Sequence, residues 1–68
     1  MSILYKYDGA VWNGDVIYKT VVEYVHAHDK RHAIVLLERR LKSKYPEISF
    51  VHLRESNLSV VPKRTQEG

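Results

Sequence analysis

The sequence predicts a small two-layer α+β domain of order ββαβ(β), in which one helix packs on one face of an antiparallel sheet of three or four strands. Three observations lead to this prediction: two β-branched segments flank an Asn-Gly pair, a segment with helical periodicity follows, and short apolar segments come after Pro46. The 68 residues suffice for one domain, which we place at residues 1–62. Residues 63–68 have nothing to bury, and we expect them to form a flexible tail.

The first two predicted strands form a hairpin. Residues 3–7 are rich in aromatic and branched side chains, with Ile3, Tyr5 and Tyr7 on one side and Leu4 and Lys6 on the other. Residues 16–25 contain four valines, one isoleucine and two tyrosines. Between them lie Asn13 and Gly14, the pair that best adopts the two positive φ angles of a type I′ turn.

The strand register follows from the position of the loop. A loop at Asn13 and Gly14 would place Tyr5 opposite Val22 on one face of the hairpin. A bulge at Asp8-Gly9 would shift the pairing by one residue and turn the other face of the second strand toward the aromatic residues of the first. The sequence leaves both registers open.

The predicted helix spans residues 30–44. Asp29 is a suitable N-cap, and Pro46 ends the helix because the residue before a proline is disfavoured in the α region. One apolar stripe faces the sheet and consists of Ala33, Ile34, Leu37, Leu41 and Tyr45.

Two further strands are predicted after the helix, at residues 48–53 and 58–61, with a turn at 55–57 between them. A right-handed crossover through the helix makes the third strand parallel to the second. If the first strand lies between them, every neighbouring pair is antiparallel. A single helix covers one face of such a sheet. The other, partly apolar face is left open and is available for a partner or for a second copy.

The composition limits the class of protein. The chain has no cysteine, no signal-peptide core and no apolar run of membrane-spanning length, and we expect a cytoplasmic protein. So short a chain can hardly wall a closed pocket, and no nucleophile has a base at a meaningful spacing. We therefore expect neither enzymatic activity nor a cofactor.

The candidate partner-binding residues are a tryptophan at the hairpin tip and basic residues of the helix: Trp12, Arg31, Arg39, Arg40 and Lys42. The net charge of +3 is concentrated on this helix. Such a stripe can steer the protein to an acidic protein surface or to phosphates, or it can be an ordinary solvated face.

Residues 26–32 contain three histidines, His26, His28 and His32, which are weak candidates for metal ligands. The segment superficially resembles the His-x-His-x-Asp-His zinc motif of the metallo-β-lactamase superfamily. It departs from that motif because Asp29 follows the second histidine directly and the last histidine comes one position late. The simpler interpretation is a solvated junction between strand and helix, without a metal.

These patterns together predict a small interaction protein, such as a phage or mobile-element regulator or inhibitor, that occupies an acidic partner protein through its open sheet face and basic helix. The alternative is a DNA- or RNA-binding module that uses the basic stripe and the strand aromatics. A homodimer through the open sheet face is also compatible with the sequence.

Overall fold

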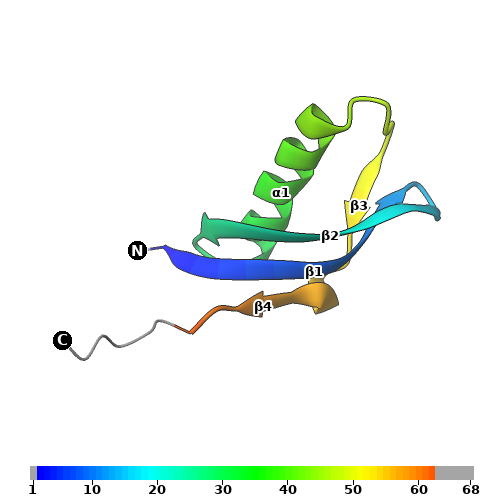
Figure 1. Cartoon of the computed structure of the whole chain (residues 1–68). Helices are drawn as coiled ribbons and strands as arrows, with labels where there is room; N and C mark the ends of the chain where they lie inside the picture. Colours follow the sequence, from blue (N-terminus) through cyan, green and yellow to red (C-terminus); the bar gives the residue numbers. More distant parts are fainter. Residues whose placement is uncertain (1, 63–68) are drawn as a thin grey trace.

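The computed structural model describes residues 2–62 and confirms the two-layer α+β fold (Figure 1). The predicted tail at 63–68 lies outside the described residues. The elements are, in order, β1 (Ile3–Asn13), β2 (Val16–Ala27), α1 (Lys30–Lys44), β3 (Val51–Leu53), the 3₁₀ helix η1 (Glu55–Asn57) and β4 (Leu58–Val60). Among these residues no helix is long and apolar enough to cross a membrane.

Strand β1 is the centre of the sheet, as predicted. It pairs antiparallel with β2 on one side, and on the other side with β3 near its C-terminal end and β4 near its N-terminal end. The predicted third strand is shorter than expected, because residues 49 and 50 form a bend instead of pairing. The chain nevertheless stays attached to the hairpin there: Gly14 N–H donates to the Phe50 carbonyl over 3.1 Å, and Phe50 N–H donates to the Asn13 side chain over 3.2 Å.

The hairpin register differs from both predicted ones. The loop is Gly14-Asp15 and not Asn13-Gly14, with φ +67° at Gly14 alone, as at the first central position of a type II′ turn. A bulge lies at Tyr18, since Val11 pairs with Lys19 but Trp12 pairs with Ile17. The predicted bulge at Asp8-Gly9 is therefore wrong in position. Its expected consequence is present, because the other face of the second strand, which carries Val25, now lies beside Tyr5.

The helix has the predicted bounds, and its N-cap is confirmed. The Asp29 carboxylate accepts the N–H of His32 over 2.8 Å, which satisfies one of the free donors of the first turn. Tyr45 closes the other end, with its N–H bonded to the Leu41 carbonyl, and Pro46 follows.

The core lies between α1 and one face of the sheet. It joins three helix residues, Ala33, Leu37 and Leu41, to residues of the strands and the loop before β3: Tyr5, Tyr7, Val11, Val25, Ala27, Ile48, Leu53 and Leu58. Side chains alternate along a strand, so the even-numbered residues of β1 up to Trp12, and those of β2 from Thr20 to His26, face away from the helix. No described element packs on that side, which we call the open face.

Tyr7 connects the core to Arg54, which lies between β3 and η1. Its side chain is fully buried, its hydroxyl donates to the Ala10 carbonyl over 2.6 Å, and the same oxygen accepts the N–H of Arg54 over 3.1 Å. Gly9 leaves room for the side chain of Asn57 in η1, because a Cβ on this glycine would lie 2.6 Å from Cγ of Asn57.

Replacing Tyr7 by phenylalanine should lower the free energy of unfolding by about 1–3 kcal/mol, because two backbone groups would lose their shared partner. Urea denaturation followed by circular dichroism measures the change. Tyr24→Phe is the matched control, since that tyrosine is 50% exposed, and it should stay within about 0.5 kcal/mol of the parent protein. Equal stability of the two variants would contradict the role given to the Tyr7 hydroxyl.

Candidate interaction surface

Trp12 lies on the open face near the hairpin tip. It pairs with Ile17 of β2 on one side and with His52 of β3 on the other. The guanidinium of Arg54 lies over its ring, 4.9 Å from the centroid, which is the geometry of a cation–π contact. The indole N–H is shielded from solvent and finds no acceptor among residues 2–62. The tryptophan is thus held flat on the sheet, half-buried, with its hydrogen-bonding capacity unused.

Large apolar side chains are exposed around this tryptophan. On the open face, Ile17 is 53%, Val22 54% and Tyr24 50% exposed. Val16, next to the hairpin loop, is 64% exposed, and Phe50, which is bonded to that loop from the segment before β3, is 73% exposed. We call these two residues the hairpin tip. Asn13 and Val16 pair one position beyond Trp12 and Ile17, so the side chains of the tip point to the helix side of the sheet. The tip therefore adjoins the open face at its end and is not part of it.

The bulge sends two consecutive side chains of β2 to the helix side, where both reach Tyr45. The rings of Tyr18 and Tyr45 are 5.7 Å apart, and the Lys19 ammonium donates to the Tyr45 hydroxyl over 3.1 Å. The Tyr18 hydroxyl also donates to Glu47, which raises the pKa of Tyr18 and lowers that of Glu47. These contacts anchor the hairpin to the end of α1.

Two of the four predicted basic helix residues are engaged within the fold. Arg40 donates to the backbone carbonyl of Tyr24 over 2.7 Å and forms a 3.4 Å ion pair with Glu23. Lys42 donates to the carbonyls of Pro46 and Ile48 and so holds the loop after the helix. Their charge therefore has an intramolecular role that the sequence did not reveal.

Arg31 and Arg39, the other two predicted residues, are exposed and make no hydrogen bond or ion pair with the residues the structure describes. Both belong to α1, which covers one side of the sheet (Figure 1), whereas the alternation of side chains along β1 places Trp12 on the other side. The structure thus separates the predicted partner-binding residues into two surfaces.

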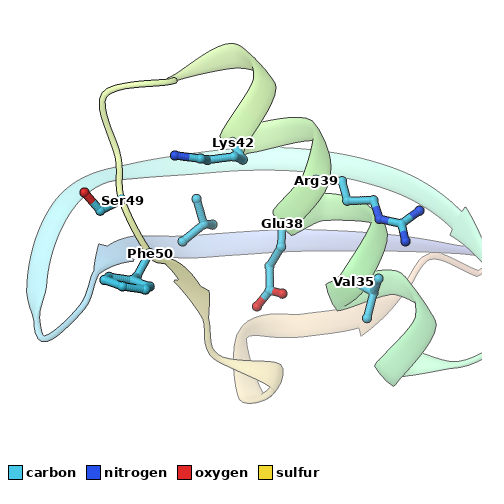
Figure 2. Close-up of a pocket in the computed structure, with 7 residues that line it drawn as sticks. Val35, Glu38, Arg39, Lys42, Ser49 and Phe50 are labelled. Atoms are coloured by element: carbon cyan, nitrogen blue, oxygen red, sulfur yellow. The ribbon is translucent and has the colours of Figure 1, made fainter.

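A shallow groove of about 430 Å³ lies between α1 and the segment before β3 (Figure 2). Its lining consists of Val35, Glu38, Arg39, Lys42, Ser49, Phe50 and Val51. Glu38 points into this groove, and partial burial raises the pKa of its carboxyl, an effect that nearby His52 opposes.

The three histidines do not converge. His26 lies on the open face, while the rings of His28 and His32 stack with their centroids 5.0 Å apart. His32 Nδ1 accepts the backbone N–H of His28 over 3.2 Å, which fixes the junction between β2 and α1. Within the described part of the chain, no group of three or more metal-ligating side chains is placed to hold an ion.

Sequence reasoning missed Arg54 and Phe50 as members of this surface. Arg54 follows a strand residue and Phe50 lies within the predicted third strand, so neither showed a distinct motif. Only the pairing of β3 with the end of β1 brings them to Trp12 and the tip.

No protein-family model, curated protein sequence or solved structure matches this chain.

Replacement of Glu38 by glutamine should stabilise the protein at pH 7. Burial raises the folded-state pKa of this carboxyl, so the stability contributed by its protonated form is present below the unfolded-state pKa and is lost as the pH rises through the folded-state pKa. Denaturation at several pH values should show the advantage of the variant at neutral pH and its disappearance in acid. A stability difference that does not change with pH would contradict this assignment.

Proposed function

We propose that this protein is a small, non-enzymatic interaction protein that binds a partner protein through its open face and hairpin tip. The observation that carries the proposal is the exposure of Ile17, Val22 and Tyr24 on a sheet face that the helix leaves uncovered. Exposed apolar side chains that gather on one uncovered sheet face, with polar groups between them, are characteristic of a binding site.

The residue types support a protein partner. Tryptophan, tyrosine and arginine are the side chains that dominate binding energy in protein interfaces, and Trp12, Tyr24 and Arg54 all belong to this face. Lys6 and Asp8 of the same face lie opposite Tyr24 and Val22 and place polar groups among the apolar residues, where a partner protein could bond to them.

The charge distribution favours an acidic partner. The chain carries a net charge of +3, and the exposed guanidinium groups of Arg31 and Arg39 contribute to it from the helical layer. Because that layer lies behind the sheet, these residues would accelerate association at long range and would not contact a partner bound to the open face.

Binding should be abolished by a charge at the centre of the apolar surface. Ile17→Glu introduces a carboxylate beside Trp12, and we expect at least about a 30-fold loss of affinity for a partner captured from cell extract and then purified. Val60→Glu is the control, because this residue is 52% exposed and pairs with Tyr5, so its side chain lies on the helix side of the sheet and the change should leave the affinity unchanged. Titration calorimetry with both variants measures the difference.

Equal loss in the two variants, or no loss in either, would contradict the proposal. A second outcome would replace it with nucleic-acid binding: affinity for generic single- or double-stranded DNA or RNA that falls steeply with salt and disappears when Arg31 and Arg39 are reversed to glutamate. We choose these two arginines because reversal of Arg40 or Lys42 would also remove contacts within the fold.

A further inference from the structure

The outer edge of β2 carries a second potential interface. In the described structure β2 pairs only with β1, so a strand of 12 residues forms an edge of the sheet. Edge strands are commonly protected by prolines, several charges, β-bulges or short length, and the bulge of β2 lies toward its N-terminal end, at Tyr18. β2 has no proline or glycine, and its only acidic or basic residues apart from His26 are Lys19 and Glu23.

The direction of the backbone groups on this edge follows from Arg40. Its guanidinium donates to the carbonyl of Tyr24, so that carbonyl points outward and is not used by β1. Backbone groups alternate along an antiparallel strand, and the N–H and C=O groups of Thr20 and Val22 therefore point outward as well. They are positioned to pair with another strand.

The sequence of this edge is complementary to itself. In a symmetric antiparallel pair centred on Val21, Thr20 lies opposite Val22 of the second copy and Lys19 lies opposite Glu23. Centring the pair on Thr20 or Val22 instead places both charged residues opposite apolar ones. The register centred on Val21 is therefore the one of these three that places neither charged residue opposite an apolar one, with Glu23 also paired to Arg40 and Lys44 and Lys19 bonded to Tyr45 within each copy.

The two features that bound residues 19–23 on this edge agree with this register. Arg40 occupies the outward carbonyl of Tyr24 at one end, and the bulge at Tyr18 interrupts regular pairing at the other. In the register centred on Val21 these two positions lie opposite each other. A ladder over residues 19–23 of both copies thus ends at the same place on each strand.

We propose that a second copy of this chain pairs with β2 through residues 19–23, across a two-fold axis at Val21. The two sheets then form one continuous sheet, with both helices on one side and both open faces on the other. The proposal does not rest on the proposed function, because Ile17 lies outside the paired segment. It would, however, give a partner protein two copies of the Trp12 surface on one side.

The chain has no native cysteine, which permits a direct test with Val21→Cys. Thr20 and Val22 form the hydrogen-bonded pairs, so the two Val21 residues form a non-hydrogen-bonded pair with Cα atoms about 4.5 Å apart, within disulfide range. Mild oxidation with copper phenanthroline should convert most of this variant to a disulfide-linked dimer on a non-reducing gel. Val16→Cys is the control and should run as a monomer on the same gel. In this register its two cysteines lie at opposite ends of the interface and cannot form a disulfide within the dimer.

Sedimentation equilibrium of the unmodified chain should show a reversible dimer. Thr20→Pro removes an outward N–H that the monomer does not use, and it should raise the dimer dissociation constant at least about tenfold while the circular dichroism spectrum stays unchanged.

Two results would overturn the proposal. One is a wild-type chain that stays monomeric at millimolar concentration. The other is a dimer that survives Thr20→Pro and does not form the Val21→Cys disulfide, since that dimer would use another surface. Because Ile17→Glu leaves the paired segment intact, loss of partner binding in that variant with the dimer retained would separate the two proposals.

Discussion

The arrangement of both faces of the sheet depends on one extra residue, the bulge at Tyr18. With the loop at Gly14-Asp15 and no bulge, Tyr5 would lie opposite Tyr24, and the larger side chains of β2 would face the helix. The bulge shifts the register so that Tyr5 instead lies opposite Val25. The smaller residues Val25 and Ala27 then face α1, which allows the helix to approach closely, and Val22 and Tyr24 are turned to the open face.

This division explains how so short a chain builds a core and a binding surface together. The helix can cover only one face, so the aromatic residues of β1 that face it, Tyr5 and Tyr7, are buried, whereas Trp12 on the other face has only the cation of Arg54 above it. The same sheet therefore supplies stability on one side and apolar contact area on the other. The outer edge of β2 is a third available surface, and it is bounded by features of the fold itself, the bulge and Arg40.

The basic residues show how packing changes the meaning of a charge pattern. As a sequence, the helix presents a continuous basic stripe, but the fold directs Arg40 to the β2 edge and Lys42 to the following loop. Lys44 reaches Glu23 over 3.7 Å and is a further example. Exposed ion pairs of this kind contribute little to stability, yet they determine which cations remain available to attract a partner. Arg31 and Arg39 are those cations among the predicted candidates.

The sequence by itself determined the element order, the helix bounds, the Asp29 cap and the uncovered face, because these follow from local periodicity, capping chemistry and the ratio of one helix to one sheet. Only the tertiary structure decided the register, the position of the bulge and the surroundings of Trp12. A one-residue shift costs little locally, but it exchanges every side chain between the two faces, and the choice is made by packing against α1. For the same reason, no local pattern could show that Arg54 would cover the tryptophan, or that the predicted binding residues would lie on opposite layers.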